Sequence, residues 1–138
     1  MKRLFHTGTN EDYLNIVVLI ARLTVSVLMI THGFPKFKTL LAGGEIHFPD
    51  PVYLGPALSL VLCVFAEFFC SVLIGIGLAT RLASIPLIIN MSVITFVMHA
   101  NDPIGEKEMA LLYLVFYLIF LVVGGGKFSV DYLITRKK

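Results

Sequence analysis

Four apolar stretches, each long enough to cross a membrane as a helix, account for most of the chain. They run from about 13 to 32, 54 to 79, 82 to 98 and 108 to 123. A helix that spans the hydrocarbon core needs about 20 predominantly apolar residues. Since the connections are short, the pattern predicts a single transmembrane domain over residues 1–138. The expected fold is all-α, an integral membrane four-helix bundle.

The composition agrees with a membrane location. The chain is 57% hydrophobic and 14% charged, with a mean hydropathy of +0.89, whereas soluble domains are about 45–50% apolar. The net charge of +2 is divided between the two ends of the chain and forms no basic patch for nucleic acid. The lipid bilayer is therefore the first partner that the sequence predicts.

Glycine and proline residues mark the expected ends of the spans. Gly33 and Pro35 predict the end of the first span, because glycine suits a helix C-terminus and proline does not continue a helix. From there to about Tyr53 runs the longest connection, which is the best candidate for a lid or a partly re-entrant segment. The glycines over 124–126 predict the end of the fourth span, followed by a short amphipathic tail.

The distribution of basic residues predicts the orientation. With four spans, both termini and the turn at Arg81 share one side of the membrane. That side carries Lys2, Arg3, Arg81, Lys127, Arg136, Lys137 and Lys138, and the opposite side carries Lys36, Lys38 and Lys107. Loops rich in Lys and Arg stay in the cytoplasm, so both termini are predicted to be cytoplasmic. The basic N-terminus has no apolar core directly behind it, and a cleaved signal peptide is not expected.

Three polar residues lie inside the spans. Counted from the cytoplasmic side, Arg22 and Glu67 differ in depth by about 5 Å at 1.5 Å per residue, and Asn90 lies at nearly the depth of Arg22. We therefore expect a buried polar core in which Arg22 pairs with Glu67 and the Asn90 amide caps the pair. Two interpretations stay open: a site that handles a proton or binds an acidic or quinone-like ligand, or an ion pair that fixes helix register.

A second polar group is predicted at the exterior edge, where three spans end or begin. It comprises His32, Lys36, His99 and Glu108, which we take as candidates for ligand binding or proton handling. The sequence allows a small-molecule or quinone head-group site, polar capping at the interface, or a divalent metal bound by two histidines and a carboxylate. The ligand spacing forms no local metal motif, so no metal site is assigned.

The two cysteines and a run of small residues are expected to serve packing. Cys63 and Cys70 are about 10.5 Å apart along a helix, too far for a disulfide bond between them. Ser71, Gly75 and Gly77 form a small-residue patch that lets helix backbones approach closely. This patch is predicted to pack against a neighbouring helix or to recruit a partner protein.

Taken together, these positions resemble those of a known family. The similarity rests on Arg22, on HGFPK over 32–36, on Glu67 followed by Gly75 and by GLATR over 77–81, on Glu108 with Ala110 to Tyr113, and on Gly124 to Gly126 with Ser129 and Asp131. This pattern, which covers nearly the whole chain in order, resembles the DoxX family of small four-helix bacterial inner-membrane proteins.

The resemblance implies a four-helix bundle in the cytoplasmic membrane. The family takes its name from a subunit of an archaeal thiosulfate:quinone oxidoreductase, and other members are linked to thiol redox and oxidative-stress complexes. This chain has no CxxC pair, so the resemblance does not extend to thiol exchange. We also expect no further domain that could hold flavin, haem or an iron–sulfur cluster, and we expect a redox partner protein to supply any such cofactor.

Three functions follow as hypotheses. The first is a membrane subunit of a redox system that binds a quinone or a similar small molecule at His32, Lys36, His99 and Glu108. The second is a non-enzymatic scaffold or assembly factor that recruits its partner through the face around Ser71 and Gly75. The third is a small proton-coupled transporter, which with four spans would need to form a homo-oligomer. The sequence leaves open whether the chain is an enzyme and assigns no catalytic residue.

Overall fold

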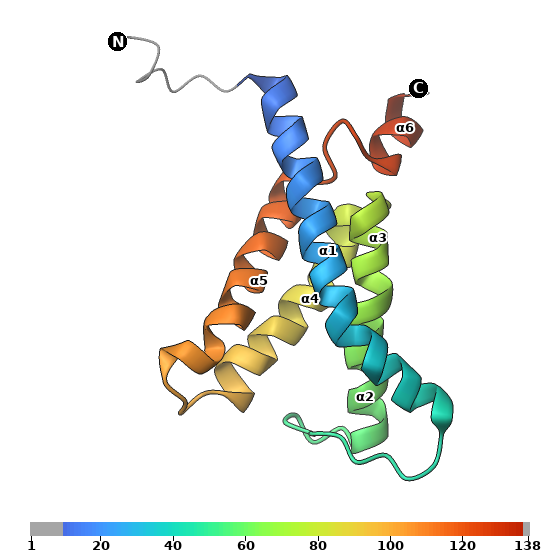
Figure 1. Cartoon of the computed structure of the whole chain (residues 1–138), viewed down its shortest axis with the longest axis vertical. Coiled ribbons are helices and arrows are strands. Elements are labelled where there is room, and N and C mark those ends of the chain that lie inside the picture. Colours follow the sequence, from blue (N-terminus) through green and yellow to red (C-terminus); the bar gives the residue numbers. More distant parts are fainter. Residues whose placement is uncertain (1–9, 137–138) are drawn as a thin grey trace.

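The computed structural model describes residues 10–136, and this part of the chain is helical without strands (Figure 1). The predicted all-α class is therefore confirmed. Two of the long helices contain a π-helical section, labelled η. The elements are α1 (Glu11–Ala42), α2 (Pro56–Val64), η2 (Phe65–Cys70), α3 (Ser71–Ile76), α4 (Thr80–Val93), η3 (Ile94–Met98), α5 (Ile104–Val123) and α6 (Val130–Arg136).

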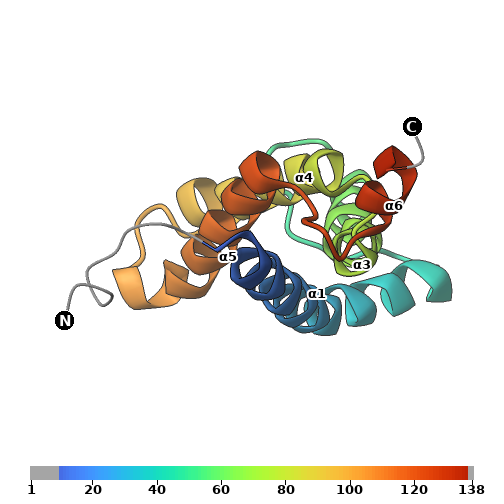
Figure 2. The same cartoon turned by 90° about the horizontal axis from the view of Figure 1, so that it is seen from above.

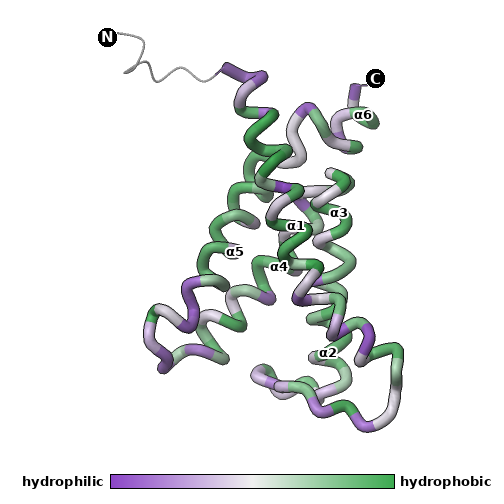
Figure 3. Tube along the Cα trace, viewed as in Figure 1, coloured by the Kyte–Doolittle hydropathy of each residue, from purple (hydrophilic) through white to green (hydrophobic). Residues whose placement is uncertain are grey.

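Four long helices form the bundle. Three of them are long and apolar enough to cross a membrane: Glu11–Ala42, Pro56–Ile76 and Thr80–Met98. The fourth, α5, has 20 residues and carries Glu106, Lys107 and Glu108 near its start, so its apolar part begins at Met109. Hydrophobic residues predominate along the middle of the long helices, where a few hydrophilic positions interrupt them, and hydrophilic residues are most frequent near the helix ends and in the connections (Figure 3).

The helix Pro56–Ile76 contacts α1 on one side and α4 on the other, and α5 packs on α4 (Figure 2). Both ends of the described chain lie at one end of the bundle, and the connections after α1 and η3 lie at the other (Figure 1). Lys127 lies at the end of the bundle that carries both ends of the described chain. Its amide donates to Asn15 Oδ1, and its ammonium nitrogen lies 3.2 Å from Asp12 Oδ1. Of the basic residues used to predict the orientation, four lie outside the described residues: Lys2, Arg3, Lys137 and Lys138.

The first helix does not end where the sequence pattern predicts. α1 continues through Gly33 and Pro35 to Ala42, so the prediction of an end at Gly33 is wrong. Gly33 is instead a crossing point, because a Cβ atom there would lie 2.8 Å from the backbone carbon of Glu67 and 2.8 Å from the amide nitrogen of Phe68. Proline and glycine are tolerated inside membrane helices where neighbouring helices pack against them.

The small-residue patch packs inside the bundle. Ser71 is fully buried, and a Cβ atom on Gly75 would lie 3.3 Å from the Cβ of Ser26 on α1. The predicted packing against a neighbouring helix is therefore found, and that neighbour is α1. Because α1 occupies this face, it is not free to recruit a partner protein.

The segment after α5 folds back onto the bundle. α5 ends at Val123, and Gly124 follows with a φ of 79°, which favours glycine. In α6, the Asp131 carboxylate accepts hydrogen bonds from the amides of Ala79 (2.6 Å) and Thr80 (2.9 Å) at the start of α4. The Asp131 amide donates to the Gly77 carbonyl at 2.9 Å. The tail therefore caps α4.

Asp131→Asn is expected to lower the free energy of unfolding by about 0.5–2 kcal/mol at neutral pH, as for other helix caps. Burial acts to raise the pKa of Asp131, but the amides of Thr80 and Ala79 and the charge of Arg22 together lower it below its ordinary value. A carboxylate with a lowered folded pKa stabilises the protein above its unfolded pKa, and this contribution disappears as the pH falls through the folded pKa.

The difference in melting temperature between wild type and Asp131→Asn should therefore be largest at neutral pH and should narrow below about pH 4. Thermal unfolding in mild detergent across this range measures it. A difference that stays constant down to acid pH would show that the carboxylate charge does not matter. Asp12→Asn, at an exposed pair with Lys127, is the matched control.

Candidate functional site

A cluster of polar side chains surrounds Glu67 in the interior. Glu67 is 1% exposed, and one of its carboxylate oxygens, Oε2, lies 2.6 Å from Lys36 Nζ. The other oxygen, Oε1, accepts from Asn90 Nδ2 at 3.0 Å and from Cys63 Sγ at 3.2 Å. The cluster thus joins α1, α2, η2 and α4, and the buried carboxylate is paired as a buried charge requires.

The local structure explains how these residues meet. Cys63 and Glu67 are four positions apart on one continuous helix, so they share a face. Lys36 reaches Glu67 because α1 continues past Gly33, and the close crossing at Gly33 brings the two helices together at this level. Asn90 approaches from α4 on the opposite side.

Arg22 does not pair with Glu67, contrary to the sequence-based expectation. Its guanidinium group is 1% exposed and makes five hydrogen bonds to backbone carbonyls. Nε donates to Ile74 at 2.9 Å, and Nη2 donates to Gly75 at 3.0 Å. The remaining bonds go to Gly125 and Phe128, the latter at 3.3 Å from both terminal nitrogens.

Arg22 binds backbone carbonyls because the end of a helix provides hydrogen-bond acceptors. The last carbonyls of α3 lie at the negative end of the helix dipole, and each has a lone pair that no α-helical amide uses. An arginine offers five N–H donors. Gly77 leaves room for the side chain, since a Cβ atom there would lie 2.8 Å from Arg22 Nη2. Arg22 therefore connects α1 with α3 and with the segment after α5, at the end of the bundle that carries the termini.

A cavity of about 720 Å³ lies beside the Glu67 cluster. Its wall is mostly apolar and comes from α1, the loop over 43–55, α2, η2, α4 and η3. The lining residues are Lys36, Phe48, Pro49, Pro51, Val52, Leu54, Ser59, Leu62, Cys63, Phe65, Ala66, Pro86, Ile89, Asn90, Val93, Ile94, Met98 and His99. Apolar walls with a few polar groups, and a volume of roughly 300–1,000 Å³, are typical of sites for small molecules. We call this cavity the Lys36 pocket.

The loop over 43–55 forms one wall of the Lys36 pocket, through residues such as Phe48 and Val52. Asp50 fixes the loop at the start of α2, where its carboxylate accepts from Ser59 Oγ (2.7 Å) and from the amides of Leu54 (2.9 Å) and Gly55 (2.7 Å). The hydrogen bond from Ser59, with those from the two amides, lowers the pKa of Asp50 below its ordinary value. The loop predicted as a lid therefore lies over the pocket.

The four residues predicted at the exterior edge do not form one site. Lys36 and His99 share the Lys36 pocket. His32 stacks edge-on against Tyr113, with ring centroids 6.3 Å apart, and lines a separate groove of about 510 Å³ between α1 and α5. Glu108 is exposed near the start of α5 and lines neither cavity. Over residues 10–136 no three metal-ligating side chains of His, Cys, Asp or Glu come together.

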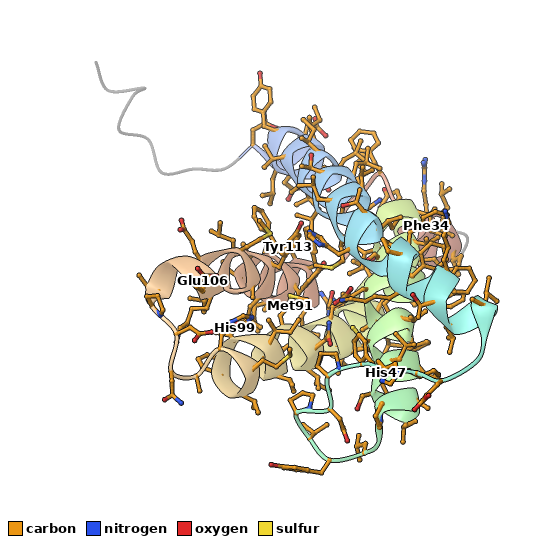
Figure 4. The ribbon with its side chains drawn as sticks, turned by 60° about the horizontal axis from the view of Figure 1, so that its bottom comes forward. Phe34, His47, Met91, His99, Glu106 and Tyr113 are labelled. Carbon is orange, nitrogen blue, oxygen red and sulfur yellow. The ribbon has the colours of Figure 1, made fainter. Side chains whose placement is uncertain are left out.

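Figure 4 shows the end of the bundle at which the connections after α1 and η3 lie. His99 lies beside the connection that follows η3, and His47 lies in the loop that crosses in front of α2. Five residues with polar side chains line the Lys36 pocket: Lys36, Ser59, Cys63, Asn90 and His99.

A comparison with protein-family models identifies the family of the chain. The model of the DoxX family matches residues 17–100, more than half of the sequence. The chain belongs to the DoxX family. With its long apolar helices, this DoxX protein is a multi-pass membrane protein.

An uncharacterized protein from Haemophilus influenzae is 29% identical to the DoxX chain over an alignment length of 131, and the match covers 88% of this chain and 92% of the relative. No solved structure matches. The segment that matches the DoxX model includes Lys36, Cys63, Glu67, Asn90 and His99, so the Glu67 cluster and its pocket residues lie inside the family's own region.

Three features of the structure were not predicted from the sequence: the pairing of Lys36 with Glu67, the contact of Cys63 with both, and the cap that Asp131 makes on α4. The sequence does contain one indication that bears on the pairing of Lys36 with Glu67. Arg22 and Lys36 are about 21 Å apart along a helix, so a single carboxylate pairs with one of them and not with both. Nothing in the sequence alone says which one.

Proposed function

We propose that this DoxX protein binds a quinone or a similar small molecule in the Lys36 pocket, as the membrane subunit of a redox system. A partner protein would supply the electron-carrying cofactor. In this proposal the protein lies in the bacterial cytoplasmic membrane with both termini in the cytoplasm, as the basic residues of that side favour.

The observation that carries the proposal is the position of Lys36 between a buried carboxylate and an apolar cavity. The Lys36 ammonium has three N–H donors, of which one is directed to Glu67 and one to Cys63. The third is available to an oxygen atom of a ligand in the pocket. Because Glu67 balances the charge of Lys36, the site favours an uncharged head group with a hydrogen-bond acceptor, such as a quinone carbonyl.

The rest of the pocket suits a hydrophobic body attached to such a head group. Ile89 and Leu62 line the cavity and are 59% and 48% exposed, so the wall continues onto the outer surface of the bundle, where lipid lies. Apolar residues of the loop over 43–55, among them Phe48 and Val52, also line the cavity. Burial of apolar ligand surface contributes roughly 25 cal/mol per Å² before the costs of binding.

A binding measurement with a benzoquinone that carries a decyl chain tests the proposal. The protein is reconstituted in nanodiscs, and bound quinone is quantified by native mass spectrometry and by equilibrium dialysis. We expect wild type to bind, and we expect Lys36→Met/Glu67→Leu, which removes both charges together, to bind about tenfold or more weakly, because a hydrogen bond from a charged donor is lost.

Lys38→Met is the matched control. Lys38 lies two residues after Lys36 on α1, and its ammonium is 4.7 Å from the centre of the Phe34 ring. It does not line the Lys36 pocket. Its affinity for the quinone should equal that of wild type. Absence of binding in wild type, or equal affinities for the double variant and the Lys38→Met control, would refute the proposal.

A further inference from the structure

His99 follows the π-helical section η3 and lines the Lys36 pocket. Its side chain is 34% exposed, and its Nδ1 atom lies 2.7 Å from Oδ2 of Asp102. The Asp102 amide donates to the His99 carbonyl at 3.1 Å. The turn that holds the two residues is therefore closed by its own backbone hydrogen bond.

The π turn places His99 on the pocket wall. The His99 amide donates to the Ile94 carbonyl at 3.0 Å, five positions earlier, whereas an α-helix bonds four positions earlier. In a continuous α-helix, Val97 would follow Val93 and Ile94 on the same face. Val97 is instead 49% exposed and does not line the pocket, whereas His99, five positions after Ile94, does. π turns of this kind are frequent at functional sites.

Asp102 determines which imidazole nitrogen is free. An ionised carboxylate only accepts hydrogen bonds, so in a neutral His99 the proton lies on Nδ1 and is donated to Asp102. The remaining ring nitrogen, Nε2, is then a hydrogen-bond acceptor. A carboxylate that orients a histidine in this way fixes both its tautomer and its ring position.

We propose that Asp102 is a positioning residue that holds His99 as a hydrogen-bond acceptor for a ligand hydroxyl, so that the Lys36 pocket prefers the hydroquinone form to the quinone form. This inference rests on the proposed function. A hydroquinone carries O–H donors that a quinone lacks. The Asn90 amide supports the same preference, since its nitrogen is used by Glu67 and its oxygen is left to accept.

The tautomer is measured without any ligand. We expect ¹⁵N NMR of the histidine side chains, assigned with His99→Gln, to show His99 protonated on Nδ1 in wild type at neutral to mildly basic pH. In Asp102→Asn the amide accepts or donates, and the signal should move toward a mixture with the Nε2–H form. A wild-type His99 protonated on Nε2, or identical spectra for wild type and Asp102→Asn, overturns the role of Asp102.

The ligand preference is measured as the ratio of the affinities for the hydroquinone and quinone forms of the decyl-substituted probe, under reducing and oxidising conditions in nanodiscs. Wild type should prefer the hydroquinone, and the ratio should fall by about 3- to 10-fold in both His99→Leu and Asp102→Asn, the effect of one hydrogen bond. Glu106→Gln, on α5 outside the pocket, should leave it unchanged.

The outcomes separate this inference from the proposed function. If both forms bind and the ratio is the same in wild type, His99→Leu and Asp102→Asn, the inference fails and the quinone site stands. If neither form binds, the proposed function and the ligand preference both fail, while the NMR spectra still decide whether Asp102 positions His99.

Discussion

Replacing Arg22 with methionine is expected to lower the free energy of unfolding by about 3 kcal/mol or more. The guanidinium group is buried and satisfies carbonyls of Ile74, Gly75, Gly125 and Phe128. Methionine fills much of the same volume but donates no hydrogen bond. Each buried acceptor left without a partner costs about 1–3 kcal/mol, and water in the bilayer interior is too scarce to replace the lost donors.

The chain provides its own reporter for this measurement. It contains no tryptophan, but Cys70 is free, 1% exposed and lines neither cavity, so a thiol-reactive dye reacts with Cys70 only as the bundle unfolds. We expect the melting temperature of Arg22→Met in detergent to fall by roughly 10 °C or more. Arg81→Met removes one exposed arginine with a single bond to the Val122 carbonyl at 3.0 Å and should melt within a few degrees of wild type. Equal melting of the two variants would mean that the carbonyls around Arg22 find other partners.

The second large effect concerns the ion pair between Lys36 and Glu67. Lys36→Met leaves a carboxylate that is 1% exposed without its cation, and breaking a buried pair in this way costs about 3–5 kcal/mol. Replacing both partners with apolar residues of similar volume is often neutral. We therefore expect Lys36→Met/Glu67→Leu to recover most of the stability that Lys36→Met loses.

A double-mutant cycle on the melting of wild type, both single variants and the double variant measures the coupling. The expected interaction energy is favourable and at the upper end of the roughly 0.5–3 kcal/mol found for residues in contact. The matched cycle pairs Lys38→Met with Glu67→Leu and should show no coupling, because Lys38 lies over Phe34 and not at Glu67. Additive losses in the Lys36 cycle would contradict the pairing.

The long helices could be predicted because segments that are buried in lipid have a high hydropathy. The three later long helices begin and end within a few residues of the expected positions. The first did not, because Gly33 and Pro35 are helix-ending residues only where no neighbour supports the backbone. Their effect depends on η2, which packs directly on Gly33, and a packing partner more than thirty positions away leaves no local mark in the sequence.

The site was predicted less completely, for two physical reasons. Depth along a helix follows from counting residues, but the direction of each side chain around the helix axis does not, so Arg22 and Glu67 were placed together on depth alone. In addition, Arg22 binds backbone carbonyls, and a carbonyl is present at every residue. The sequence therefore could not show which of them would meet the guanidinium group, and Lys36 was assigned to the edge because the helix was expected to end before it.

The π turn of η3 accommodates one residue more than an α turn without changing which side of the helix the pocket histidine faces. A π turn holds one residue more than the α turn that it replaces. Deletion of one residue over 95–98 would restore the α-helical pattern, because the histidine amide would then bond to the Ile94 carbonyl four positions earlier and the histidine would stay on the pocket wall. A relative with one residue fewer over this segment could thus keep the histidine in the pocket, one position earlier in its sequence. Alignments of relatives around η3 should therefore be compared by length before they are compared by residue identity.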